Sequence, residues 1–317
     1  MSKLHVVMYH YVRDLKHSRY PEIKGLHSSY FREQLQFLKS NFTIVTIEDV
    51  MEAYQGVKTL PPNAALLTFD DGYIDHFTNV FPLLMTEKVQ GSFFIPGITF
   101  TEHKLLDVNK IHFVLASTNI NTLVEELYQQ LNYYRGNEFD LPSNEELFSQ
   151  HAVATRFDSK ETIFVKRLLQ TVLPERLRNM ITSNIFEKYV GLSEETFARE
   201  LYMNTDQIKC MKDSGMFIGL HGYDHYWLGN LSEDEMKNDI EKALAVMGDF
   251  IDKDAWVMNY PYGSYNENVT RYVSEQGCKL GFTTQVRIAD IDADNRYTIP
   301  RLDTNDYPPK SDHYRRL

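Results

Sequence analysis

Short apolar runs alternate with amphipathic segments in the first hundred and the last hundred residues of this chain. Of all the features of the sequence, this alternation most narrows the folds that the chain can adopt. Residues 4–9, 42–45, 64–67 and 91–96 have the composition of strands, and segments with helical spacing lie between them. The pattern resumes at residue 206, with strands predicted at 216–220, 255–258, 280–284 and 297–302. A strand–helix–strand order of this kind predicts an α/β fold with a parallel sheet or a barrel.

Residues 103–203 interrupt that rhythm with helical patterns alone. Leu123, Leu127 and Leu131 recur every four residues, and Pro174 and Gly191 suit a helix start and a helix end. About a hundred residues exceed any ordinary loop. We therefore expect residues 1–102 and 204–317 to form one domain and residues 103–203 to form a large helical insertion.

The bulk composition limits the class of protein. The chain has 317 residues and a formal charge of −11, and no basic stripe is present, so a nucleic-acid partner is not expected. No apolar run approaches the ~18 residues of a membrane span, and the amino-terminal run is too short for a signal peptide. We expect a cytoplasmic protein. Its two cysteines, Cys210 and Cys278, are not expected to form a structural disulfide.

Two acidic residues, Asp70 and Asp71, follow the apolar run at 64–67. Adjacent carboxylates at a strand end repel each other unless a cation or a proton lies between them. His221 and His225 follow another apolar run about 150 residues later, and a carboxylate with two imidazoles is a common ligand set for a divalent metal. Taken alone, the acidic pair also fits a capped turn, and the histidine pair fits an exposed surface.

Several separated motifs, in order, resemble the NodB-homology polysaccharide deacetylases, carbohydrate esterase family 4. The resemblance covers residues 4–100 and 201–303. It implies a distorted (β/α) barrel with seven strands, whose chemistry lies at the carboxyl ends of the strands. The residues that carry it are Thr68-Phe69-Asp70-Asp71, His221 with His225, and Pro261-Tyr262-Gly263, together with Met8-Tyr9-His10, Phe31-Arg32-Glu33-Gln34-Leu35 and Gly91-Ser92-Phe93-Phe94.

The resemblance also implies a role for each matched residue. Asp71, His221 and His225 would bind a divalent cation, zinc by preference and cobalt, nickel or manganese as alternatives. Asp70 would act as general base on water. The backbone N–H of Tyr262 would help to bind the oxyanion, which makes Tyr262 a substrate-binding candidate.

The sequence departs from the family pattern in two places. Asn259 stands where the third motif of the family usually begins with an arginine that orients the base, and we keep Asn259 as a substrate-binding candidate. Arg301 is our candidate for the missing tether to Asp70, the alternative being an ion pair with Asp303. The family's carboxy-terminal Leu-His, which supplies the general acid, has no counterpart. His10 is a candidate for that acid or for a substrate contact, the alternative being a core histidine.

These features predict a metal-dependent carbohydrate deacetylase, a hydrolase acting on C–N bonds other than peptide bonds. Its substrate would be an N-acetyl or O-acetyl group of a sugar or sugar precursor in surface polysaccharide biosynthesis. One alternative is an amide hydrolase acting on a non-sugar substrate with the same scaffold. Another is a catalytically silent carbohydrate-binding homologue. The insertion could cap the barrel, build a substrate pocket or form an oligomer interface.

Overall fold

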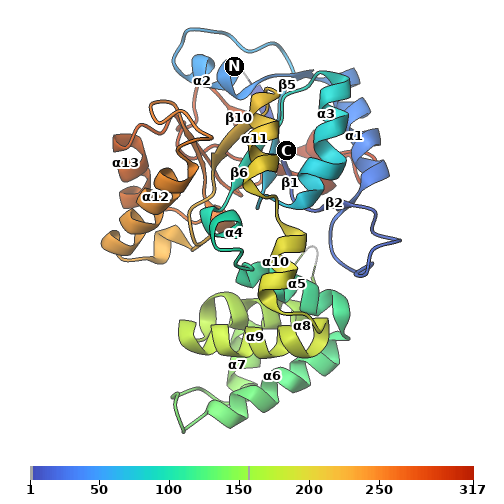
Figure 1. Cartoon of the computed structure of the whole chain (residues 1–317), viewed down its shortest axis with the longest axis vertical. Coiled ribbons are helices and arrows are strands. Elements are labelled where there is room, and N and C mark those ends of the chain that lie inside the picture. Colours follow the sequence, from blue (N-terminus) through green and yellow to red (C-terminus); the bar gives the residue numbers. More distant parts are fainter. Residues whose placement is uncertain (1–2, 156–157) are drawn as a thin grey trace. The chain divides into compact units, whose positions relative to one another are not determined.

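The structure, a computed structural model, describes residues 3–155 and 158–317, and the chain divides into two compact units (Figure 1). The first unit contains Met1–Asp14, Gly25–Lys104 and Arg199–Leu317, and the second contains Leu15–Lys24 and Leu105–Ala198. Residues 15–24, which we expected in the barrel domain, group with the helices of the second unit.

A curled, mostly parallel sheet forms the centre of the first unit. β5 pairs in parallel with β1 on one side and with β6 on the other, and the order continues through β7 and β8 to β9. β10 adds an antiparallel edge to β1, β4 pairs with β5, and β2 and β3 form a separate pair. The strands are β1 (Lys3–Tyr9), β2 (Val12–Arg13), β3 (Leu26–His27), β4 (Thr43–Ile44), β5 (Ala64–Asp70), β6 (Ser92–Ile95), β7 (Phe217–Leu220), β8 (Val257–Asn259), β9 (Leu280–Phe282), β10 (Ala289–Asp290) and β11 (Leu302–Asp303).

The chain segment around β11 lies between the two ends of the sheet. Ile299 forms a parallel bridge with Phe282 of β9, and Leu302 pairs in parallel with Val7 of β1. The predicted strand at 297–302 is thus only partly regular, but it links the last long strand to the first. The predicted distorted (β/α) barrel is confirmed.

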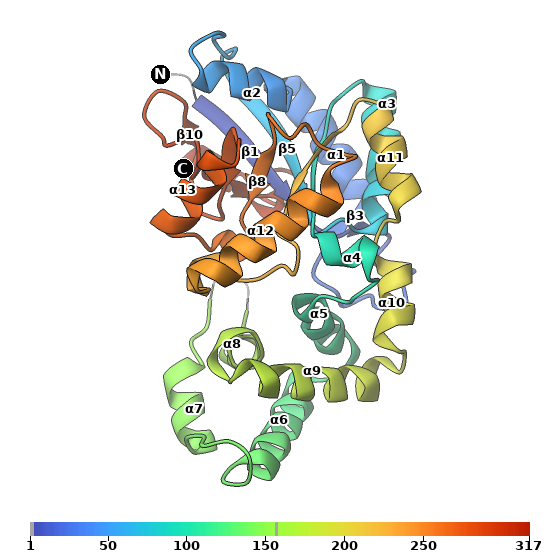
Figure 2. The same cartoon turned by 60° about the vertical axis from the view of Figure 1, so that its left-hand side comes forward.

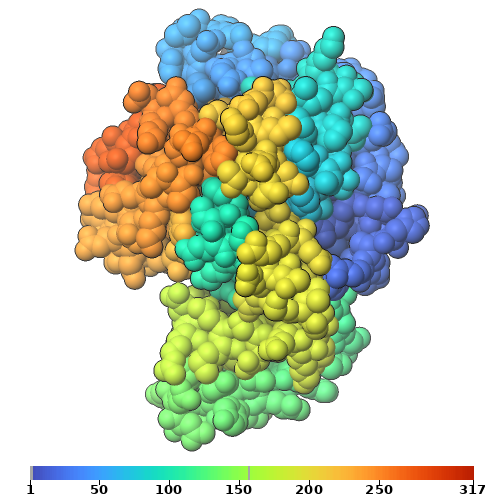
Figure 3. All heavy atoms as spheres, in the orientation of Figure 1, coloured from blue at the N-terminus to red at the C-terminus, as the bar shows by residue number. Residues whose placement is uncertain are grey.

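Apolar side chains fill the inside of the barrel, and α2 (Ile47–Tyr54) packs against them. Leu4 and Leu66 belong to the same fully buried cluster as Phe282 of β9 and Ile47 and Val50 of α2. Further helices surround the sheet (Figures 1 and 2), and their side chains cover it in the space-filling view (Figure 3). They are α1 (Ser28–Asn41), α3 (Phe81–Glu87), α4 (Gly97–Thr101), α11 (Thr205–Asp213), α12 (Glu233–Met247) and α13 (Glu267–Glu275).

The ends of these helices follow local sequence signals. Thr46 and Ser232 begin α2 and α12 as predicted, each in a reciprocal capping box. The restart expected near Pro82 is present, because a π-helical turn at His76–Val80 gives way to α3 there. The prediction of Ser29 as the first cap is wrong. His27 is the N-cap of α1, and its ring accepts a hydrogen bond from the Ser29 N–H.

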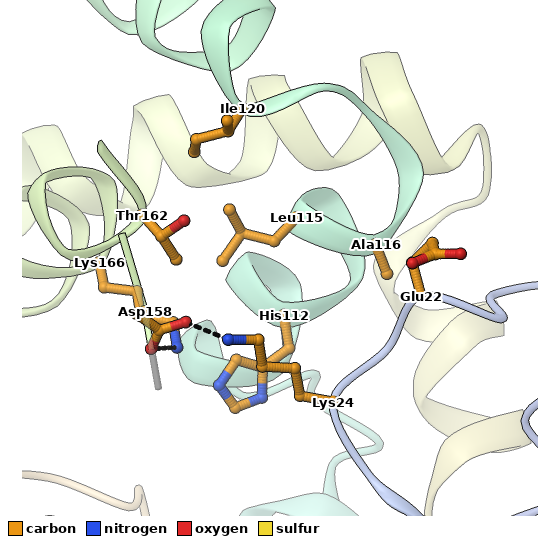
Figure 4. A pocket seen from close by; sticks show the side chains of 9 residues that line it. All are labelled: Glu22, Lys24, His112, Leu115, Ala116, Ile120, Asp158, Thr162 and Lys166. Carbon is orange, nitrogen blue, oxygen red and sulfur yellow. Dashed lines mark hydrogen bonds and ion pairs between the residues drawn. The ribbon is translucent and has the colours of Figure 1, made fainter. Parts of the chain in front are cut away.

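The second unit is helical, as the leucine spacing predicted. Pro174 and Gly191 flank its longest helix at the start and the end, as expected. This unit contains a pocket of about 140 Å³ (Figure 4). In its lining, Lys24 and Lys166 both form ion pairs with the carboxylate of Asp158. The helices are α5 (Asp107–Ser117), α6 (Ile120–Tyr134), α7 (Asn144–His151), α8 (Lys160–Arg167), the π-helical turn Leu168–Val172 and α9 (Glu175–Val190), and α10 (Glu194–Leu201) follows them in the chain.

Two further expectations concern the whole chain. Both cysteines are free thiols, and Cys278 is buried. Across the part of the chain that the structure describes, none of the helices combines the length and the apolar character that crossing a bilayer requires.

We predict that the barrel interior carries a large part of the stability of the first unit. Leu66→Ala should lower the free energy of unfolding by about 2–5 kcal/mol, because it leaves a cavity among fully buried side chains. Val57→Ala is the control, since Val57 is 72% exposed and its loss should change stability by less than about 0.5 kcal/mol. Denaturant unfolding measures both. Equal losses in the two variants would contradict the assigned core.

Candidate metal and catalytic site

The predicted site residues lie at one end of the parallel strands. Asp70 is the last residue of β5 and Asn259 the last of β8, while His10 and His221 directly follow β1 and β7. Because these strands run in parallel, their carboxyl ends meet at the same edge of the barrel. The structure therefore brings together residues that are up to about 250 positions apart in the chain.

Asp71, His221 and His225 form a compact group at this edge. Oδ1 of Asp71 lies 3.4 Å from Nε2 of His221 and 3.3 Å from Nε2 of His225. One ligand atom from each of the three residues lies within 4.8 Å of the other two, and all three side chains are buried. The predicted convergence of the carboxylate and the two imidazoles is present.

The geometry of this group fits a divalent cation. Ligand atoms about 2.1 Å from a tetrahedral zinc ion lie about 3.4 Å from one another, which matches the distances between Asp71 and the two imidazoles. Oδ1 of Asp71 is buried and forms no hydrogen bond. A buried charged oxygen without a hydrogen-bond partner is costly, and a cation would compensate it.

Neighbouring groups fix the orientation of two of these side chains. Nδ1 of His221 lies 2.6 Å from the backbone oxygen of Asn259, so Nδ1 carries the proton and Nε2 presents its lone pair to the site. The Tyr73 hydroxyl donates to Oδ2 of Asp71 over 2.5 Å, which leaves Oδ1 toward the imidazoles. Such outer contacts are typical of metal ligands.

The protonation states also suit metal binding. Burial lowers the pKa of His225, although Asp71 opposes the shift, so this imidazole is neutral at pH 7. Although burial would raise the pKa of Asp71, that pKa lies well below its usual range, so the carboxyl is ionised at neutral pH. A neutral imidazole beside an ionised carboxylate is the form in which both bind a cation.

Three residues in or next to the Asp71–His221–His225 group have a left-handed backbone conformation. Asp71, His225 and Tyr262 have φ values of +73°, +60° and +58°, a region that non-glycine residues rarely adopt. Each costs on the order of 1–3 kcal/mol unless the surroundings enforce it, and such residues cluster at functional sites. Gly72, with φ +69°, leaves no room for a side chain, because a Cβ there would lie 2.8 Å from Ile95.

Asp70, the second carboxylate, is bound by Arg301. The guanidinium donates from Nη1 to Oδ1 over 2.9 Å and from Nη2 to Oδ2 over 2.8 Å, and its Nε donates to the Thr283 backbone oxygen. Both side chains are almost fully buried. The predicted tether is therefore present in the structure, and the alternative of a surface pair with Asp303 is not.

This ion pair sets the charge of Asp70. Burial would raise the pKa of Asp70, but Arg301, with a smaller contribution from His10, lowers it to about 2. Asp70 is therefore ionised at neutral pH. His10 lies at the rim of the site, with Nε2 3.7 Å from Oδ2 of Asp70 and its side chain 40% exposed. The backbone oxygen of His10 contacts Nε2 of the buried His76.

Asn259 and Tyr262, the two substrate-binding candidates, differ in their surroundings. The Asn259 side chain is fully buried, and neither its oxygen nor its nitrogen forms a hydrogen bond. Tyr262 is half-buried, and its ring lies edge-on to His225 at 4.7 Å and stacks on Trp227 at 4.3 Å. The Tyr262–Trp227 pair forms an aromatic wall beside the imidazole of His225.

Sequence reasoning missed three residues that support the site, namely Tyr73, Trp227 and Asp239. Tyr73 and Trp227 each lie two residues beyond a predicted ligand, which was the only local signal. Asp239 lies on the apolar face of α12 with Met236 and Ile240, and it is buried there. An acid on an apolar helix face was a signal that could have been used.

Comparison with known proteins finds a family model that matches part of the chain. Residues 149–281 match the family model described as polysaccharide deacetylase. The matched segment includes both histidines and the Pro261-Tyr262-Gly263 turn, but not the Asp70-Asp71 motif. The matched segment begins at residue 149, inside the predicted insertion at 103–203, to which the predicted resemblance did not extend.

Individual relatives agree with that family. A segment of 61 residues is 44% identical to the poly-beta-1,6-N-acetyl-D-glucosamine N-deacetylase of Escherichia coli (strain K12), covering 19% of this chain and 9% of that protein. This chain therefore matches about a tenth of that relative. The resemblance to polysaccharide deacetylases that the motifs predicted is confirmed.

Solved structures share the fold. The Streptococcus pyogenes deacetylase PplD, solved with acetate, aligns over 98% of this chain and 96% of its own, with a TM-score of 0.57 and 16% identity. IcaB from Ammonifex degensii aligns over 99% of this chain and 97% of its own, with a TM-score of 0.56 and 19% identity. At this level of identity the likeness establishes the fold alone.

We predict that the stability contributed by Arg301 depends on pH. Arg301→Gln leaves Asp70 buried without its cation and should cost about 3–5 kcal/mol of unfolding free energy at pH 7. The folded-state pKa of Asp70 is depressed, so the ion pair stabilises the protein fully above the unfolded pKa of about 4 and is lost as the pH falls through about 2. The difference between the variant and the native protein should shrink over that window.

Denaturant unfolding of the metal-free protein between about pH 6 and pH 2 measures this effect. Arg287→Gln is the matched control, because Arg287 forms a two-bond pair with Asp294 but is 38% exposed, and its loss should cost under about 1 kcal/mol. A cost for Arg301→Gln that does not change with pH would contradict the assigned ion pair.

Proposed function

We propose that this chain, which resembles the polysaccharide deacetylases in sequence and in fold, is a metal-dependent carbohydrate deacetylase. It would hydrolyse the N-acetyl or O-acetyl group of a sugar or sugar precursor in surface polysaccharide biosynthesis. The observation that carries the proposal is the pairing of a three-ligand group, Asp71–His221–His225, with a separate ionised carboxylate, Asp70, at the same barrel edge. Its cytoplasmic location stays a prediction.

The three ligands would leave coordination positions for water and substrate, as catalytic zinc sites do. A cation held there would lower the pKa of a bound water and polarise the acetyl carbonyl. Asp70 cannot take a proton from ordinary water, because its pKa is about 2 and that of water is about 16. Asp70 therefore needs a water whose pKa has been lowered. Because a cation bound by the three ligands would lower it, the base and the metal ligands would act together.

The protein side chains then handle the protons. Asp70 accepts the proton of the attacking water, and Arg301 holds both carboxylate oxygens so that the base keeps one orientation. His10, at the exposed rim and 3.7 Å from Asp70, would donate a proton to the leaving nitrogen or oxygen. The backbone N–H of Tyr262 would contribute to binding the oxyanion. Acetate and a free amine or hydroxyl leave the site.

The aromatic wall supports a sugar as the substrate. Trp227 and Tyr262 stack with their ring planes only 4° apart beside His225. The ring faces that do not contact each other are flat and apolar, and the C–H face of a pyranose ring would pack on such a surface. This feature favours the carbohydrate substrate over the non-sugar amide. The intact Asp70–Arg301 pair argues against a catalytically silent homologue.

The direct test uses the full chain loaded in turn with zinc, cobalt, nickel and manganese. Mass spectrometry follows loss of acetyl groups from N-acetylglucosamine oligosaccharides, nucleotide-linked N-acetyl sugars, O-acetylated sugars and acetylated peptides. We expect deacetylation of at least one sugar class and none with His221→Ala, which removes a ligand. Reaction with the peptides alone would indicate a general amide hydrolase, and bound metal with no reaction would indicate a silent homologue.

We predict that His10 supplies the proton to the leaving group. His10→Gln should lower kcat by about 10²- to 10⁴-fold, and the fall in rate at alkaline pH should disappear, because a general acid must be protonated to act. Metal content should not change, since His10 is outside the three-ligand group. A His10→Gln profile that keeps its alkaline limb would remove His10 from this role.

A further inference from the structure

Both histidine ligands lie on one short loop, and that loop has an unfavourable backbone. Gly222 has a φ of +69° and His225 a φ of +60°, so two of its five residues occupy the left-handed region. A non-glycine residue there costs on the order of 1–3 kcal/mol unless other contacts hold it. The ring orientation of His221 is fixed by its hydrogen bond to the Asn259 backbone oxygen. The position of His225 follows from the backbone conformation of the loop.

The carboxylate of Asp239 binds the backbone between the two histidines. Its Oδ2 accepts from the N–H of Tyr223 over 3.0 Å, and its Oδ1 accepts from the N–H of Asp224 over 2.8 Å. Both oxygens are thus used on consecutive amides of the ligand loop. Gly222 fits closely against the same carboxylate, since a Cβ on Gly222 would lie 2.9 Å from Oδ2.

The opposite side of the loop backbone is held by α4. The N–H of Gly97 donates to the Gly222 oxygen over 3.1 Å, and the N–H of Ile98 donates to the Tyr223 oxygen over 3.0 Å. The amides of the loop therefore bind one helix and its carbonyls bind another. Two rigid helices fix the peptide groups that separate the ligands.

Asp239 forms no close ion pair that would explain its burial, although the charge of Lys242 acts on it from a greater distance. The residue is 2% exposed, and among residues 3–155 and 158–317 no basic side chain lies within the 4.0 Å of a salt bridge from its carboxylate. Keeping a carboxylate buried on the apolar face of a helix is costly, and the backbone amides of the ligand loop are its hydrogen-bond partners. We therefore attribute the burial of the Asp239 carboxylate to the two hydrogen bonds that it accepts from the ligand loop.

We propose that Asp239 is a positioning residue for the metal site, which sets the distance between His221 and His225 through the backbone of residues 223 and 224. This inference rests on the proposed metal site. Asparagine cannot replace the carboxylate, because its single oxygen can serve one of the two amides while its NH₂ group would face the other. The Asp239→Asn variant should hold the loop at only one amide and misplace the Nε2 atom of His225.

The experiment measures binding of Zn²⁺ and Co²⁺ to the full chain without any substrate. A chromophoric chelator that competes for the metal gives Kd, and the visible bands of bound Co²⁺ report its coordination geometry. Asp239→Asn should weaken Zn²⁺ binding by about 10- to 100-fold, the usual effect of losing a contact that orients a ligand. The Co²⁺ spectrum should change as well.

Two further variants keep the test decisive. Asp234→Asn removes the same charge from an exposed position near the start of the same helix and should match the native protein in both readouts. Asp239→Glu keeps the buried charge and shifts the carboxylate by one methylene, so it should also weaken binding. It replaces Asp239→Asn if circular dichroism shows that the asparagine variant does not fold.

The outcomes separate this inference from the proposed function. Native Zn²⁺ affinity and an unchanged Co²⁺ spectrum in folded Asp239 variants would overturn the positioning role and leave the metal site intact. No binding by the native chain would overturn both. Weakened binding in the Asp239 variants, with Asp234→Asn unchanged, supports the positioning role.

Discussion

Two ionised carboxylates leave the end of one buried strand, and the site depends on how their charges are compensated. Asp70 and Asp71 are adjacent, and each is at most 3% exposed. Asp70 is paired with a guanidinium that donates to both of its oxygens, whereas Asp71 faces two imidazoles and retains an oxygen without a hydrogen bond. Neighbouring like charges at this depth would otherwise force one carboxyl to take up a proton.

This division of charge gives the two residues different chemistry. The carboxylate fixed by Arg301 is ionised at neutral pH and keeps one orientation, but it is weakly basic, so it would accept a proton only from an activated water. The other carboxylate, Asp71, accepts a hydrogen bond from the Tyr73 hydroxyl on one oxygen. Its second oxygen is thereby left close to the imidazole nitrogens of His221 and His225. One strand end thus provides both a base and a ligand because the surroundings differ, as in other sites where paired carboxyls take separate roles.

Much of the fold and of the ligand set could be predicted from the sequence. The alternation of strands and helices predicted a parallel sheet or a barrel, and the family resemblance implied the distorted barrel. The candidate ligands were polar residues placed directly after apolar runs, since parallel strands bring such positions together. Arg301 could be named as a candidate, but its contact with Asp70 depends on a strand segment that bridges β9 and β1, which local pattern does not reveal.

Other parts of the site could not be predicted because they are tertiary. Asp239 is bound to a loop some 15 residues away in sequence, and neither residue type nor spacing indicates that contact. Residues 15–24 group with the helical unit through contacts that no motif records. The cap of α1 was misplaced because a histidine ring acts there in place of the commoner serine.

The most direct measurement of the central claim is X-ray absorption at the zinc edge on the full chain with one equivalent of Zn²⁺. The account predicts a first shell of oxygen and nitrogen at about 2.0–2.1 Å, with the outer scattering of two imidazole rings. That outer scattering should fall to one ring in a variant that lacks His225. A shell containing sulfur, or one without imidazole scattering, would show that these residues do not share a cation and would contradict the account.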